Sequence, residues 1–175
     1  MTVKHQQSPS ITNDQATIRV PNATGAGAQG YLKNVSDSVV LVASQDVAST
    51  VRLVRVPTNA KIKRVTLTSQ AQTQGTFDIG VYYPTDGPTA KADLLANTIV
   101  AAFFASAIDL TSAYLPTDVT NESGTYTIDL WNQPLWKALG LASDPGGEFD
   151  IVATCVSSAV TTATGIMGLS VDFVE

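Results

Sequence analysis

Few side chains in this sequence could perform catalysis. His5 is the only histidine and Cys155 the only cysteine among 175 residues. The histidine lies in a polar stretch at the amino end, so a Ser-His-Asp or Cys-His mechanism would need a base delivered by that stretch. The cysteine alternates with Phe149, Ile151 and Ala153, which predicts an inert core thiol. One cysteine and one histidine cannot build a zinc framework, so we expect no metal site.

Carboxylates are the other residues that could support hydrolysis, because a pair of them can cleave glycosides without histidine. The candidates are Asp78, Asp129 and Asp150, and their spacing gives no sign that two of them meet. Asp86-Gly and Asp144-Pro-Gly-Gly could offer oxygens to calcium, but both are ordinary turn sequences and lack the regular acidic spacing of a calcium loop. We therefore predict a protein that is not an enzyme and has no cofactor.

A glycine-rich stretch around residues 22–30 resembles a phosphate loop only in its letters. Gly25, Gly27 and Gly30 have the spacing G-x-G-x-x-G. No Lys-Ser/Thr follows them, and the next residues, Tyr31 to Val42, have the composition of a strand instead of the helix that such a loop requires. Nucleotide binding is therefore not predicted.

The positive charges are concentrated in one short region. Five of the ten lysines and arginines lie within thirteen residues, namely Arg52, Arg55, Lys61, Lys63 and Arg64. This group is the candidate partner-binding site, and an acidic protein surface is the partner that we consider first. Two alternatives stay open: charges that guard a sheet edge against mispairing, and nucleic acid. The net charge of −5 argues against nucleic acid as the main partner, because phosphate binding needs a broad positive field.

The composition indicates assembly. Only 14% of the residues are charged, against roughly 25% in an average globular protein, and neutral polar residues take their place. Such residues can enter a wet protein contact without the desolvation cost of lysine or glutamate. The longest apolar run, Ile99 to Ala105, is far too short to span a membrane, and Met1 to Ser10 lacks the apolar core of a signal peptide. The expected site of synthesis is a reducing cytoplasm.

The pattern along the chain predicts an all-β fold with short strands about ten residues apart, typical of a sandwich or barrel. We expect a flexible N-terminal arm over residues 1–15, which does not pack on its own core, and a single sandwich domain over residues 16–175. The expected strands are Ala16–Val20, Tyr31–Asn34, Ser38–Ala43, Thr50–Val56, Ala60–Ser69, Gly75–Tyr83, Thr125–Trp131, Glu148–Ser157 and Gly165–Val174, with the run Ile99–Ala105 as either strand or helix.

Hydrophobic alternation identifies core faces in two of these strands. Phe77, Ile79 and Val81 share one face of their strand, while Met167, Leu169, Val171 and Phe173 share one face of the last strand, opposite Gly168, Ser170 and Asp172. In the basic region the alternation changes phase, and a β-bulge near Lys63-Arg64 would restore it.

One or two short helical inserts interrupt the strands. Lys91 to Asn97 could form one helical turn, and Trp131 to Gly140 fits a short helix with Pro134 in its first turn and Gly140 at its end. Exposure of Trp131 and Trp136 on one face would instead favour a sugar-binding platform.

Three segments resemble small virion proteins of tailed bacteriophages: VRLVRVPTNAKIKRVTL, DIGVYYPTDG and KADLLA, within residues 50–97. The resemblance implies a jelly-roll-like antiparallel β-sandwich and a non-enzymatic role as a capsid decoration or cement protein. It implies the major capsid protein of the same virion as partner, a dimer or trimer of this chain, and a place on the capsid exterior after synthesis in the host bacterial cytoplasm. A neck, tail or fibre module that binds carbohydrate is the alternative.

Overall fold

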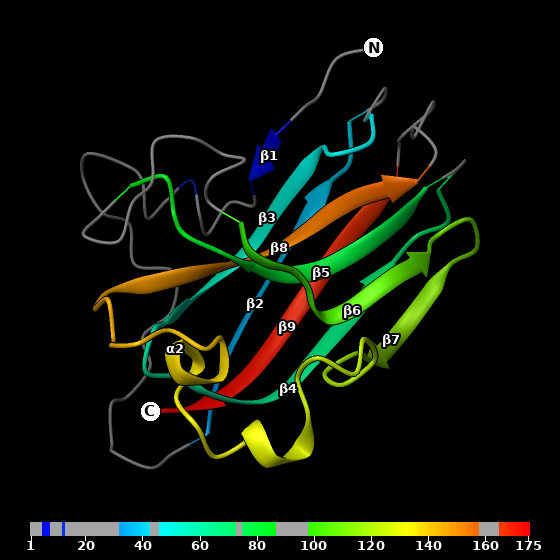
Figure 1. The fold of residues 1–175 in the computed structure, drawn as a ribbon. Coiled ribbons are helices and arrows are strands. Elements are labelled where there is room, and N and C mark those ends of the chain that lie inside the picture. Colours follow the sequence, from blue (N-terminus) through cyan, green and yellow to red (C-terminus); the bar gives the residue numbers. More distant parts are fainter. Residues whose placement is uncertain are drawn as a thin grey trace.

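The computed structural model describes residues 5–7, 12, 32–42, 46–72, 75–86, 98–157 and 165–175. Their strands form two sheets that pack face to face (Figure 1). Sheet A has the order β1-β3-β8-β5-β6 and sheet B the order β2-β9-β4-β7. The elements are β1 (His5–Gln7), β2 (Lys33–Val40), β3 (Thr50–Pro57), β4 (Lys61–Ser69), β5 (Thr76–Tyr82), β6 (Thr98–Asp109), β7 (Tyr114–Asp118), η1 (Ile128–Leu130), α2 (Leu135–Ala138), β8 (Glu148–Ser157) and β9 (Ile166–Val174).

Strands β2 to β9 have the connectivity of a jelly roll. Successive strands mostly cross from one sheet to the other, so that β9 lies between β2 and β4, and β8 lies between β3 and β5. All pairs among these eight strands are antiparallel. Two four-stranded sheets joined in this order define the double Greek key of jelly-roll proteins. The predicted all-β sandwich is confirmed.

The core lies between the two sheets and includes the side chains of β5 and β9 that the alternation predicted. Phe77, Ile79 and Val81 of β5 are fully buried, and so are the alternate apolar side chains of β9. Phe103 and Phe104 pack against Tyr126, with ring centroids 5.3 Å apart in both pairs. The Tyr126 hydroxyl donates a hydrogen bond of 2.8 Å to the Ile62 carbonyl, which satisfies its one polar atom inside the core.

The predicted β-bulge is present. In the pairing of β4 with β9, Ile62 lies opposite Phe173 and Arg64 opposite Asp172, which leaves Lys63 as the extra residue. A second register shift, which the sequence analysis did not predict, lies between Arg52 and Val54 in β3. Because one extra residue reverses the alternation, Arg52 and Arg55 both point away from the core.

The secondary structure differs from the expectations in three places. Residues 125–131 form a turn and the 3-10 helix η1 instead of a strand, and strand β7 lies in a segment that the pattern did not identify. The two strands expected at residues 31–34 and 38–43 are the single strand β2, because Val35 and Val39 continue one alternation across them. The expected helix is present as the single turn α2, with Pro134 at its N-cap and Gly140 after its end at φ 76°.

The amino-terminal arm is described at Thr12 and at β1, which adds to sheet A beside β3 in a parallel pairing. The sequence predicts an arm that does not pack on its own domain, but His5–Gln7 do pair with a strand of that domain. The reason is that strand pairing uses main-chain groups, so a polar sequence can add to an edge as well as an apolar one. The expected strand at residues 16–20 and the expected helical turn at residues 91–97 lie outside the described residues. No described helix is long and apolar enough to cross a membrane.

Candidate functional site: the two outer faces of the sandwich

The outer face of sheet A carries a buried ion-pair cluster. Arg52 donates from Nη1 to Asp150 Oδ2 at 2.5 Å, and Arg55 donates from Nε to Asp150 Oδ1 at 2.6 Å. Asp150 is completely buried on the neighbouring strand β8, and the two arginines are 1% and 8% exposed. One carboxylate therefore holds two guanidinium groups that water barely reaches.

Acidic groups at the rim complete the cluster. Arg55 Nη2 lies 2.9 Å from Asp86 Oδ1, and its Nη1 lies 4.0 Å from Glu148 Oε2. Burial alone would lower the pKa of Arg55, but the hydrogen bond and charge of Asp150, and then those of Asp86, outweigh it and raise that pKa. Arg52 also donates to the Tyr83 carbonyl at 3.1 Å. The cluster thus ties residues 83–86, just after β5, to strands β3 and β8.

Neighbouring side chains on this face are also buried. The guanidinium carbon of Arg52 lies 5.9 Å from the centroid of the Tyr82 ring, and the Tyr82 hydroxyl is 2.6 Å from Thr154 Oγ1. Tyr82, Thr154 and Val152 are all less than a tenth exposed. Although these residues point away from the sandwich core, the chain shields them from solvent, so this part of sheet A offers a partner little surface.

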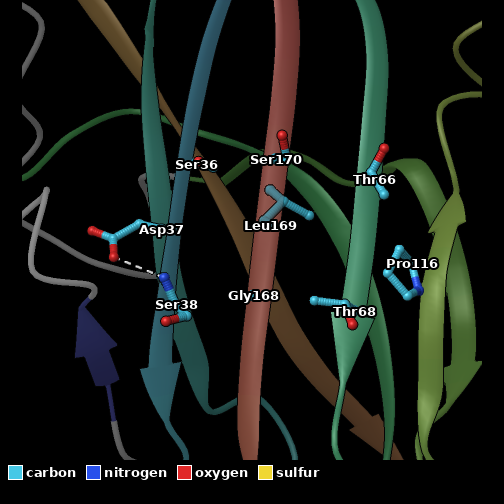
Figure 2. Close-up of a pocket in the computed structure, with 9 residues that line it drawn as sticks. All are labelled: Ser36, Asp37, Ser38, Thr66, Thr68, Pro116, Gly168, Leu169 and Ser170. Atoms are coloured by element: carbon cyan, nitrogen blue, oxygen red, sulfur yellow. Dashed lines mark hydrogen bonds between the residues drawn. The ribbon is translucent and has the colours of Figure 1, made fainter. Parts of the chain in front are cut away.

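The outer face of sheet B is open. Three strands meet there with small polar residues, and Figure 2 shows how they surround a shallow hollow of about 510 Å³. β2, β9 and β4 run side by side, with β7 at the margin. The lining residues are Ser36, Asp37, Ser38, Thr66, Thr68, Pro116, Gly168, Leu169 and Ser170.

Gly168 sets the depth of this hollow. A Cβ at this position would lie 3.2 Å from the Thr68 methyl carbon and 3.5 Å from Ser38 Cβ, so the flanking strands carry short side chains that close over the glycine. The Asp37 carboxylate accepts a hydrogen bond of 2.7 Å from the Ser38 main-chain N–H. The middle of the face therefore presents hydroxyl groups and one glycine instead of long charged side chains.

Apolar and charged residues lie at opposite ends of this face. Val40 and Ile166 are cross-strand partners of β2 and β9, and they are 57% and 42% exposed. At the other end, Arg64 Nη2 lies 2.8 Å from Asp172 Oδ2, and the Arg64 side chain is 60% exposed. The face thus combines an apolar end, a centre of hydroxyl groups with the Asp37 carboxylate beside them, and a charged end.

The five predicted basic residues do not form one surface. Arg52 and Arg55 meet around Asp150 on sheet A, whereas Lys61, Lys63 and Arg64 belong to β4 of sheet B. Lys63, the bulged residue, donates from Nζ to the Trp131 carbonyl at 2.8 Å and to Asn132 Oδ1 at 2.9 Å. Arg64 and the half-buried Lys61 remain on the outside of sheet B.

The candidate catalytic carboxylates have separate partners. Asp78 accepts a hydrogen bond from the Ala107 N–H at 2.7 Å, Asp129 accepts one from the Thr127 hydroxyl, and Asp150 holds the arginines. No group of three or more histidine, cysteine or acidic side chains with metal-binding geometry occurs among the described residues.

The remaining candidate residues are buried or partly buried against the core. Cys155 is buried, as predicted, and burial, followed by the charge of Asp46, raises the pKa of its thiol. Trp131 and Trp136 are partly buried and pack against the core cluster. Neither indole stands out as a sugar-stacking platform.

Comparison with solved structures identifies two phage capsids that contain a chain with this fold. A chain in the capsid of Ralstonia phage GP4 superposes with a TM-score of 0.64 at 16% sequence identity, over 98% of this chain and 97% of that one. A chain in the capsid asymmetric unit of cyanophage Pam1 gives a TM-score of 0.50 at 19% identity, over 90% and 94% of the two chains. No protein-family model and no curated protein sequence matches the chain. At these identities the likeness establishes a shared fold.

Proposed function

We propose that this chain is a non-enzymatic structural protein of a tailed-phage virion, which binds the assembled capsid shell as a cement or decoration subunit. The observation that carries the proposal is the end-to-end match of its fold to a chain of a phage capsid, with almost the whole length of both chains covered. Because a fold alone does not define a function, the argument also depends on which surface of the sandwich is free to bind.

The open face of sheet B is the docking surface in this proposal. Its serine and threonine side chains lose little conformational entropy when they are immobilised, and their hydroxyl groups can both donate and accept hydrogen bonds. A long charged side chain in the same place would cost more to order and to desolvate. The exposed pair Val40 and Ile166 adds apolar area at one end.

The partner is the major capsid protein of the same virion, contacted on the capsid exterior after synthesis in the host bacterial cytoplasm. Of the five basic residues, Arg64 and Lys61 are the ones suited to an acidic patch on that partner, with Lys63 beside them on the bulge. Arg52 and Arg55 then contribute through the stability of sheet A, since their charges are satisfied within the chain.

Repetition makes weak contacts sufficient. A capsid presents many equivalent sites, and a dimer or trimer of this chain would engage several of them at once. The second and third contacts are then intramolecular, so modest affinity at each gives strong retention.

Binding to purified empty heads that lack this protein tests the proposal. We expect the chain to sediment with expanded heads, and Thr68→Arg to abolish sedimentation while the variant stays folded, because an arginine there fills the hollow. Ser143→Arg is the matched control, since Ser143 is exposed in the loop before β8, and it should bind like the unmodified chain. Failure of the folded, unmodified chain to bind heads would overturn the proposal. If Thr68→Arg binds heads as well as the unmodified chain does, the hollow of sheet B is not the docking surface.

A further inference from the structure

Strand β2 lies at one edge of sheet B as the described strands define it, with β9 on its inner side. Leu41, just past the end of β2, donates its N–H toward β9, to the Gly165 carbonyl at 3.0 Å. Gln6, on the other side, donates from Nε2 to the Val40 carbonyl at 2.8 Å and accepts at Oε1 from the Val42 N–H at 3.2 Å. Because main-chain groups alternate in direction along a strand, the even-numbered residues of β2 direct theirs to the outer edge.

The carboxyl-terminal half of this edge is already occupied. Besides the two Gln6 contacts, the Asp37 carboxylate accepts a hydrogen bond of 2.7 Å from the Ser38 main-chain N–H. In the amino-terminal half, no described residue forms a hydrogen bond with the edge-facing N–H or carbonyl group of Asn34 or Ser36. Each of these two residues offers one donor and one acceptor, which are the groups that a neighbouring strand uses. This short section of edge can therefore pair with another strand.

The side chains of this section carry opposite charges on either side of a valine. By the alternation of the strand, Lys33 and Asp37 share the side of Val35, which packs against the core. Lys33 pairs with Glu175, and its ammonium group has further hydrogens to donate. A carboxylate accepts several hydrogen bonds, so Asp37 can take another donor while it keeps its present contacts. A strand with the same residues in the reverse direction would match these charges.

We infer that two copies of this chain pair through β2, antiparallel and related by a two-fold axis at Val35. In this register Asn34 of one copy lies opposite Ser36 of the other, and the two positions exchange both main-chain hydrogen bonds on each side of the axis. Lys33 of each copy lies opposite Asp37 of the other, and the two Val35 side chains meet at the axis. The pairing uses only the section of edge that the described chain leaves open.

The same two charges disfavour the neighbouring registers. An axis at Asn34 would place Lys33 opposite Val35, and an axis at Ser36 would place Asp37 opposite Val35. In both cases a charge faces an apolar side chain instead of the opposite charge. An inward-pointing charge at a sheet edge also hinders pairing with an arbitrary strand. Lys33 and Asp37 therefore select a second copy of this chain in one register.

The pairing joins the two copies of sheet B into one continuous sheet, with the two-fold axis perpendicular to it. The hollows of the two copies then open on the same side, which suits the proposed docking to a shell with repeated sites. The pairing itself needs only two copies of the chain. Its test contains no capsid, so its outcome is independent of whether the chain binds heads.

Sedimentation equilibrium of single and mixed charge variants tests the pairing. The interface is small, so we expect the unmodified chain to dimerise with a dissociation constant of about 10 µM to 1 mM. Lys33→Glu alone and Asp37→Lys alone each place like charges opposite one another on both sides of the axis, and each should weaken dimerisation by about tenfold or more. An equimolar mixture of the two variants pairs opposite charges again, so heterodimers should form with about the affinity of the unmodified chain. The double variant Lys33→Glu/Asp37→Lys should likewise dimerise on its own.

Asp109→Lys is the matched control. Asp109 is exposed at the end of β6, on the edge of sheet A opposite β1, and accepts a hydrogen bond of 2.8 Å from the Thr111 N–H much as Asp37 does from Ser38. This variant should dimerise like the unmodified chain. An unmodified chain that stays monomeric up to about 1 mM would contradict the inference. Single variants at position 33 or 37 that dimerise normally would also contradict it, and so would a mixture and a double variant that both stay as weak as the single variants.

Discussion

The two outer faces of this sandwich differ in whether their outward-pointing side chains are buried or open to solvent. On sheet A, Arg52, Arg55 and Asp150 point away from the core and are nevertheless buried, together with Tyr82 and Thr154. On sheet B, the equivalent outward positions carry serine, threonine and glycine and line an open hollow. The same architecture thus has one face occupied by its own buried charges and one whose outward residues stay accessible.

This difference shows that charge and exposure can be poor guides to a binding surface. Half of the positive charges lie in the β3–β4 region, yet the two most buried of them serve to neutralise an internal carboxylate. A carboxylate shared by two arginines fixes the geometry of the face, because each partner would be costly to leave unpaired. The sheet B face has no such constraint and can meet another protein.

The largest effect should come from breaking the ion-pair cluster. Asp150→Asn keeps the shape of the side chain but leaves Arg52 and Arg55 without their shared buried charge, so we expect a loss of about 3 to 5 kcal/mol in the free energy of unfolding. Arg64→Ala removes the corresponding pair on sheet B, where the arginine is 60% exposed, and should cost less than about 1 kcal/mol. Urea unfolding of both variants measures the difference, and equal losses would remove the contrast between the faces.

A pair of glycines gives the next largest contrast. A Cβ at Gly80, on the outward side of β5, would lie 2.1 Å from the Ala101 carbonyl oxygen, so Gly80→Ala must displace the main chain of β6. We expect a loss of about 1 to 3 kcal/mol or more. A Cβ in Gly168→Ala on sheet B would lie 3.2 Å from the Thr68 methyl carbon and at ordinary contact distance, 3.5 Å, from Ser38 Cβ, so this change should cost well under that. Thermal unfolding in which Gly168→Ala is the more damaging change would contradict this reading of the two faces.

The smallest contrast compares two threonines. Thr154→Val leaves the buried Tyr82 hydroxyl without its partner at 2.6 Å and should cost about 1 to 3 kcal/mol. Thr66→Val, on the hollow of sheet B, is expected to change stability by less than about 0.5 kcal/mol. Chemical denaturation distinguishes the two, and a stability loss in Thr66→Val as large as that in Thr154→Val would mean that the hollow is part of the structural core.

Period-two alternation explains why much of the fold was predictable. It identified the core faces of β5 and β9 and, through its change of phase, the bulge at Lys63. It failed for residues 125–131, whose apolar side chains belong to a turn, and for β7, whose mostly exposed residues include Pro116 and give no core alternation. Edge strands owe their position to the neighbouring strand more than to their own side chains.

The site was less predictable, because each of its two parts depends on the pairing of strands that are far apart in the sequence. The proximity of Arg52 to Asp150 is set by the register of β3 against β8, nearly one hundred residues away in the chain, and by a bulge at Leu53 that the sequence pattern did not locate. The hollow had a weak signal in the sequence: Gly168 and Ser170 were predicted to face outward. Their meeting with Ser38 and Thr68 required the strand order β2-β9-β4.

Thiol labelling on and off the capsid tests most directly whether the open face of sheet B is the surface that binds. In a Cys155→Ser background, Ser38→Cys lies on the hollow and Ser106→Cys lies exposed on β6 of sheet A. We predict that empty heads slow alkylation of the cysteine at position 38 by about tenfold or more, while the rate at position 106 is nearly unchanged. Protection at position 106 with none at position 38, on chains that sediment with the heads, would contradict the account.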